Sequence, residues 1–180
     1  MGIFMPCGHI QLQEPLEFLQ LLYQFSDSIF QLGRICSIRQ LPKASAQDQI
    51  TTVLSSIRLN GEKAFTTYQG GTTGERFVQY LKEILLPTLK PGDIVVMDNM
   101  RSHHVKAVRE VLEEKGMKVL YLPPYSPDLN PIEKMWSKMK ALLRGWKVRS
   151  LDLLPDAVRM ALDSVSQLDC LHWFVASAYC

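Results

Sequence analysis

The segment Lys90–Arg144 constrains the fold more than any other part of the chain, because its pattern predicts a strand, a helix and a second strand. The apolar run Ile94–Met97 follows a Pro-Gly turn and is rich in β-branched residues, as in a buried strand. An amphipathic helix is expected over Val105–Gly116, and a second apolar run covers Lys118–Leu122. Two strands joined through a helix normally lie parallel, with a right-handed crossover.

Upstream of this unit, the pattern predicts an antiparallel hairpin followed by a helix. Two runs of strand-forming residues, Ile50–Leu59 and Glu62–Tyr68, flank the turn dipeptide Asn60-Gly61. An amphipathic helix is expected over Gly74–Leu86, and Pro87 should end it. Antiparallel strands followed by a parallel crossover indicate an α/β protein with a mixed sheet and flanking helices.

Downstream, a proline-rich loop leads into further helices. Pro131 suits the first turn of a helix, and Asn130 is expected to act as its N-cap. An amphipathic helix is predicted over Leu151–Val165. A short final element, Leu171–Tyr179, should pack its aromatic side chains on the core.

The length of 180 residues suits one domain with a proper core. We expect a poorly patterned N-terminal segment over residues 1–48, with at most a degenerate first strand, and the folded domain over residues 49–180; Gly33–Gln49 reads as loop. The sequence has no signal-peptide pattern and no run near the ~18 apolar residues of a membrane helix. Its four cysteines lack metal-type spacing, so a cytoplasmic location with reduced thiols is expected.

Two carboxylates from different elements are candidates for one site. Asp98 follows the strand Ile94–Met97, Glu133 lies in the first turn of the helix after the next strand, and 34 residues separate them. Taken alone, a strand-end Asp is usually a turn residue, and a first-turn Glu usually interacts with the helix dipole. Asn99 and His103 lie close to Asp98 in the sequence. The combination favours a functional site.

The sequences VVMDN, SHH and LPPYSPDLNPIE resemble the catalytic half of mariner-like insertion-sequence transposases, which are DDE superfamily endonucleases. The resemblance covers about Ile50–Tyr179 and implies a ribonuclease-H-like mixed sheet flanked by helices. It also implies an Asp-Asp-Glu triad that binds two Mg²⁺ or Mn²⁺ ions, which prefer oxygen ligands. Asp98 and Glu133 match the second and third members of that triad. Supporting roles are expected for Asn99, His103 and Asn130.

The first carboxylate of the triad is missing where the family pattern places it. Alignment backwards from Ile50 puts that position near Glu17–Leu22, where there is no Asp; Glu17 is the nearest acid, and Asp27 is the only Asp before Asp48. We therefore expect impaired DNA cleavage. The sequence also shows no helix-turn-helix module ahead of the catalytic part, so we expect an N-terminally truncated, degraded or separately encoded catalytic fragment.

A basic stretch follows Glu133. Six Lys or Arg and no acidic residue lie in Lys134–Arg149, whereas the first thirty residues contain no Lys or Arg. Such cations could neutralise DNA phosphates, although a solvated helix face is the alternative. DNA contacts are expected from Lys134, Lys138, Lys140, Arg144 and Lys147. The implied partners are transposon ends and target DNA; a homodimer is left open, and no membrane partner is expected.

Three functions stay open at this point. The first is a transposase catalytic domain that cleaves and transfers DNA strands with a metal ion, impaired by loss of its first Asp. The second is a remnant that binds DNA or a full-length relative without cutting. The third is an unrelated metal-dependent phosphodiester hydrolase that uses the same two carboxylates.

Overall fold

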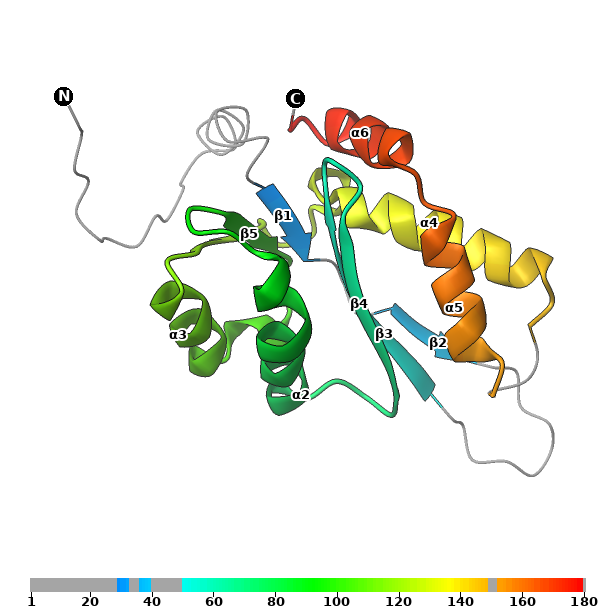
Figure 1. The fold of residues 1–180 in the computed structure, drawn as a ribbon, viewed down its shortest axis with the longest axis horizontal. Helices are drawn as coiled ribbons and strands as arrows, with labels where there is room; N and C mark the ends of the chain where they lie inside the picture. Colours follow the sequence, from blue (N-terminus) through cyan, green and yellow to red (C-terminus); the bar gives the residue numbers. More distant parts are fainter. Residues whose placement is uncertain (1–28, 33–35, 40–49, 149–151, 180) are drawn as a thin grey trace.

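The computed structural model describes residues 29–32, 36–39, 50–148 and 152–179, and it has a mixed β-sheet with helices on both faces (Figure 1). The strands are β1 Ile29–Leu32, β2 Cys36–Arg39, β3 Ile50–Arg58, β4 Lys63–Gln69, β5 Ile94–Met97 and β6 Lys118–Tyr121. The helices are α2 Gly74–Tyr80, α3 Lys106–Glu114, α4 Pro131–Gly145, α5 Leu154–Asp163 and α6 Gln167–Ala176. A π-helical turn, Leu81–Leu85, and a 3-10 turn, Leu86–Thr88, prolong α2.

The sheet combines an antiparallel half with a parallel half. β3 pairs antiparallel with β4 on one side and with both β1 and β2 on the other. Phe30 of β1 is opposite Arg58, and Cys36 of β2 is opposite Val53, so β1 and β2 act as one interrupted strand along β3. β1 also pairs in parallel with β5, and β5 pairs in parallel with β6, as the strand–helix–strand pattern predicted.

Two hydrophobic clusters cover the two faces of the sheet. Along β5, Ile94 and Val96 belong to the cluster that includes residues of α4, α5 and α6. Val95 and Met97 belong to the cluster that includes residues of α2 and α3. All four side chains are buried, which explains why this strand is a continuous apolar run rather than an alternating one.

Most of the elements expected after residue 49 are confirmed within a few residues. The predicted loop Gly33–Gln49 is wrong in part, because β2 lies inside it and pairs with β3. The helix expected to begin at Val105 begins at Lys106, and Val105 is its N-cap residue and is 38% exposed. The boundary at residue 49 stays a prediction, and residues 1–28, including Glu17 and Asp27, lie outside the described residues.

Candidate active site

Asp98 lies where the sequence placed it, directly after β5. β1, β5 and β6 run parallel, so their C-terminal ends meet at the same edge of the sheet. In open α/β sheets, this edge is where ligands commonly bind. The Asp98 side chain is 20% exposed, so it remains accessible to a small ligand.

A buried histidine holds the Asp98 carboxylate. His103 Nδ1 lies 2.7 Å from Asp98 Oδ1, and the backbone N–H of Met100 donates to the same oxygen at 3.2 Å. The His103 side chain is fully buried, and its ring stacks at a tilt on Phe77 with 4.3 Å between ring centroids. His103 Nε2 has no hydrogen-bond partner in the described part of the chain. His103 therefore contacts Asp98 through Nδ1 and makes no hydrogen bond through Nε2 within the described residues.

The packing of α2 fixes the position of the segment that carries His103. The Phe77 ring belongs to α2, and the helix begins at Gly74 after the N-cap Thr73. A Cβ added at Gly74 would lie only 2.7 Å from Val105 Cγ2, so the glycine lets the segment after β5 approach the start of α2. Tyr121 Oη donates to the His103 carbonyl at 2.9 Å and ties this segment to β6.

His104 makes a second set of contacts beside Asp98. Its Nε2 contacts Asn99 Oδ1, and its ring stacks on Tyr121 with 4.3 Å between centroids. Partial burial, followed by the nearby His103 and Arg109, lowers the pKa of His104. A neutral His104 can stack on Tyr121 and bond Asn99 at the same time, so Asn99 ties His104 to the segment that follows β5. The supporting role of Asn99 at the site stays a prediction.

Glu133 lies in the first turn of α4, as expected, and it is partly buried. Pro131 starts the helix, and the Glu133 N–H donates to the Asn130 carbonyl at 3.0 Å. Asn130 occupies the N-cap position, but its side chain makes no capping hydrogen bond, so that part of the prediction is wrong. Asn130 is buried, and its Oδ1 lacks a partner among the described residues. The backbone of Asn130 therefore orients Glu133.

Asp98 and Glu133 thus follow neighbouring parallel strands. The N–H of Leu122, just after β6, donates to Met97 O at 2.8 Å, which holds the two strand ends together. α4 then packs near β1, the strand on the other side of β5. The expectation that the two carboxylates lie within a few ångströms of each other remains a prediction.

The strand beside Asp98 carries no acid. β1, with the sequence IFQL, pairs with β5 so that Leu32 is opposite Met97. No Asp or Glu occurs anywhere in residues 28–47. The segment Glu17–Leu22, where the sequence placed the first triad position, lies outside the described residues.

The candidate ligands are of the type that a hard cation prefers, but they are too few to form a complete metal site. Carboxylate oxygens are the ligands that Mg²⁺ prefers. Within the described ranges, however, no group of three or more His, Cys, Asp or Glu is placed to hold a metal ion. Asp98 Oδ2 makes no hydrogen bond or ion pair with a described residue, because His103 and Met100 both contact Oδ1.

Two other carboxylates, Asp93 and Asp128, lie close in sequence to the candidate pair. Asp93 lies at the opposite end of β5 from Asp98, and both oxygens of its buried carboxylate contact the Arg58 guanidinium. Asp128 lies in the exposed 3-10 turn Pro127–Leu129. Neither the start of β5 nor this turn brings a second carboxylate next to Asp98. Asp98 and Glu133 therefore remain the candidate pair.

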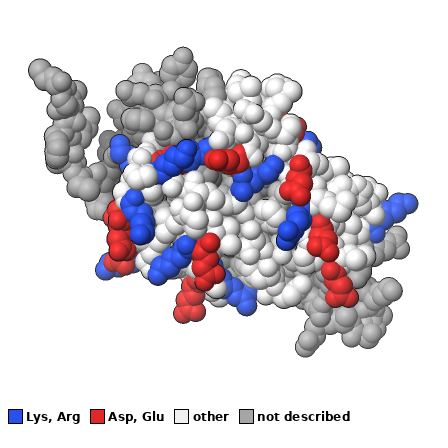
Figure 2. Space-filling model, viewed as in Figure 1, with Lys and Arg blue, Asp and Glu red and all other residues white. Residues whose placement is uncertain are grey.

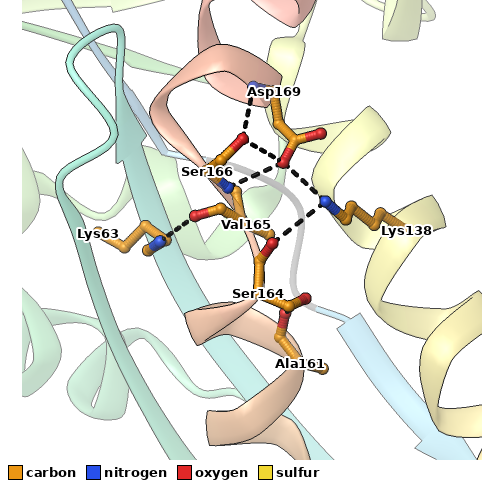
Figure 3. Close-up of polar contacts among 7 residues, drawn as sticks. All are labelled: Lys63, Lys138, Ala161, Ser164, Val165, Ser166 and Asp169. Atoms are coloured by element: carbon orange, nitrogen blue, oxygen red, sulfur yellow. Dashed lines mark hydrogen bonds and ion pairs between the residues drawn. The ribbon is translucent and has the colours of Figure 1, made fainter.

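The basic residues of α4 divide into two groups. Lys134 Nζ donates to Ser177 Oγ at 3.0 Å. Lys138 Nζ contacts Asp169 Oδ2 at 2.6 Å and Ser164 O at 3.2 Å, as Figure 3 shows. These two lysines bind the C-terminal part of the chain to α4. Among the described residues of Lys134–Arg149, the exposed basic residues are Lys140 and Arg144 in α4 and Lys147 just after it.

Asp169 also closes a capping box at the start of α6, because it accepts from the N–H of Ser166 while Ser166 Oγ accepts from the N–H of Asp169 (Figure 3). The hydrogen bond from Lys138, followed by that from the Ser166 backbone, lowers the pKa of Asp169 to about 2. In the sequence, the capping box is signalled by the spacing of Ser166 and Asp169, which is typical of a helix start. Lys138 therefore has a structural partner.

Charges of both signs are interspersed on the face drawn in Figure 2, and that face shows no large basic patch. Any nucleic-acid contact on this side would therefore involve a few placed cations rather than a broad field. Among the described residues, no helix is long and apolar enough to cross a membrane.

The sheet order and the helical layers on both faces define a ribonuclease-H-like fold. The catalytic domain of Mos1 mariner transposase superimposes with a TM-score of 0.70 at 17% identity, covering 91% of this chain and 85% of that one. The same domain with raltegravir and Mg gives a TM-score of 0.68 at 19% identity, covering 91% and 87%. The Mos1 paired-end complex with the left transposon end gives 0.65 at 17% identity, covering 99% and 64%.

The family model described as DDE superfamily endonuclease matches residues 37–154, which is more than half of the sequence. The chain therefore belongs to the DDE superfamily of endonucleases. No match was found among the curated proteins. The matched range contains both Asp98 and Glu133 and begins after β1.

Proposed function

We propose that this chain is a transposase catalytic domain of the mariner-like type, built for metal-dependent cleavage and transfer of DNA strands, with impaired cleavage. The observation that carries the proposal is the Asp98 carboxylate, held by a buried histidine at the sheet edge from which α4 and Glu133 follow. The family membership and the fold support the same reading.

Asp98 and Glu133 would hold Mg²⁺ or Mn²⁺, and a bound ion of this kind would activate the attacking group and stabilise charge on the phosphate. The protein contributes orientation. His103 fixes Asp98 Oδ1 and leaves Oδ2 for the ligand, and the Asn130 carbonyl fixes the first turn that carries Glu133. His103 is thus a positioning residue, and its side chain is buried rather than solvated.

Impaired cleavage follows from the missing third ligand. A two-metal site needs enough carboxylates to hold both ions, and the strand next to Asp98 has none in its described residues. The same observation favours a second candidate function, a remnant that binds DNA or a full-length relative without cutting it.

The first test is a strand-cleavage assay on DNA that carries the cognate transposon ends, with Mg²⁺ or Mn²⁺. We expect little or no nicking on a denaturing gel, at the level of an Asp98→Asn control. Robust cutting that Glu17→Ala or Asp27→Ala abolishes would contradict this expectation and would identify the missing ligand. Cutting that needs no transposon end would instead favour an unrelated hydrolase.

The exposed cations of α4 form a line that starts at the candidate site. Glu133, Ser137, Lys140 and Arg144 are spaced by four, three and four residues, so they share one face of the helix. Ser137, Lys140 and Arg144 are exposed, whereas Lys134 and Lys138 lie on another face and bind the C-terminal part of the chain. We propose that the DNA backbone follows this line away from the site.

Replacing both Lys140 and Arg144 by alanine is expected to weaken DNA binding about tenfold or more at low salt. It should also make the slope of log affinity against log salt less steep by about two. Two phosphate contacts are lost, so binding releases fewer counterions. Fluorescence anisotropy over a salt series measures both effects.

The matched control is Lys138→Ala, which removes a cation from the same helix. It should leave the salt slope unchanged and lower the thermal stability instead, since Lys138 bonds Asp169. An equal loss of DNA affinity in the control and in the double variant would exclude the proposed path.

A further inference from the structure

The loop between β6 and α4 displays one aromatic side chain fully to solvent. Tyr125 has a relative exposure of 103%, the highest among the exposed large hydrophobic residues of the described chain. It lies between Tyr121, the last residue of β6, and Pro131, the first of α4. The loop that carries Glu133 into place therefore also carries an uncovered aromatic ring.

The backbone at Tyr125 is in a conformation that a tyrosine rarely adopts. Its φ is +58°, in the left-handed region that glycine and asparagine tolerate best. Pro124 precedes it in the same turn. Strained positions of this kind cluster at ligand-binding sites, and they persist only where the surrounding structure enforces them.

The loop around Tyr125 is held firmly at several points. Ser126 Oγ donates to Pro123 O at 2.5 Å, and the N–H of Asn130 donates to Pro127 O at 3.0 Å. Tyr179, which is fully buried, donates from its hydroxyl to Leu129 O at 2.8 Å. The loop backbone that carries the exposed ring is therefore fixed by hydrogen bonds.

A nucleobase is the occupant that best fits such a ring at this place. Aromatic side chains stack on bases of any sequence, and an unpaired base offers both faces of its ring. The loop leaves the sheet edge of Asp98, and the exposed cations Lys140 and Arg144 lie on the helix that follows it. Phosphates bound along that helix would bring the bases of the same strand towards the loop.

We propose that Tyr125 stacks on an unpaired base of the DNA bound at the Asp98 edge. This inference rests on the proposed DNA-binding function and specifies which form of DNA the site prefers. The hydrogen bonds of the turn hold the backbone that carries the ring before DNA binds, so little loop ordering is needed when the base stacks.

The test compares two DNA probes and three proteins. The probes are a short duplex with one unpaired 2-aminopurine and the same duplex fully paired. The proteins are the wild type, Tyr125→Phe, which keeps the ring, and Tyr125→Asn, which removes it but tolerates the positive φ. The thermal unfolding midpoint of Tyr125→Asn should equal or exceed that of the wild type, because the strained residue is gone.

We expect Tyr125→Asn to bind the unpaired probe roughly 5- to 100-fold more weakly and to lose the quenching of 2-aminopurine fluorescence. Its affinity for the paired probe should match the wild type, and Tyr125→Phe should behave like the wild type on both probes. Unchanged binding and quenching in Tyr125→Asn, or an equal loss on both probes, would overturn this inference alone. Failure of the wild type to bind either probe would overturn the proposed function together with it.

Discussion

Replacing Asp93 by alanine is expected to lower the free energy of unfolding by about 3–5 kcal/mol, the cost of removing one partner from a buried ion pair. Asp93 and Arg58 are both buried, and Asp93 Oδ1 lies 3.3 Å from Arg58 Nη1 while Oδ2 contacts Nη2. Asp93 Oδ2 also accepts the N–H of Lys90 at 2.8 Å. Alanine would leave the guanidinium buried with less compensation.

Chemical denaturation with urea measures this loss. The double variant Arg58→Met with Asp93→Val is the control, because apolar residues of similar volume often replace a buried ion pair at little cost. It should recover much of the stability. A loss below about 1 kcal/mol in Asp93→Ala would mean that the pair behaves as an exposed one.

The two acids that flank β5 have different roles. Asp93 precedes the strand and is neutralised by Arg58, whereas Asp98 follows it and contacts a histidine at the edge where the parallel strands end. Replacing Asp93 would therefore reduce metal binding indirectly, because it would unfold part of the protein population. The exposed Asp128 is a better control for any metal experiment.

The strands and helices from β3 to α6 could be predicted from sequence because their signals are local. The apolar run of β5, the Asn60-Gly61 turn and Pro131 each specify an element within a few residues. β1 and β2 could not be placed in this way. Each has four residues, and their strand conformation depends on pairing with β3, which lies far along the chain.

The candidate site was only partly predictable for the same reason. Asp98 and Glu133 could be located because each follows a clear strand or begins a clear helix. The contact of His103 with Asp98 could not be predicted, because it depends on how the His103 ring packs against Phe77. The contact of Lys138 with Asp169 likewise joins two helices that the sequence alone does not orient.

The central claim is that Asp98 and Glu133 form the metal site, and Mn²⁺ binding tests it most directly. Titration followed by water-proton relaxation counts the bound ions without needing the cognate DNA. Asp98→Asn keeps an oxygen that can accept from His103, and Glu133→Gln keeps the length of the side chain, so both remove charge with little change of shape. Asp128→Asn is the matched control in the exposed turn before α4.

We expect one weakly bound Mn²⁺ per chain, because the proposed site has only two carboxylates and the described residues contain no cluster of three or more ligands. Asp98→Asn and Glu133→Gln should each weaken binding at least about 10- to 100-fold, since even residues behind the direct ligands contribute that much to metal affinity. Asp128→Asn should bind Mn²⁺ like the wild type. Binding that is unchanged in both Asp98→Asn and Glu133→Gln would contradict the assignment of the site.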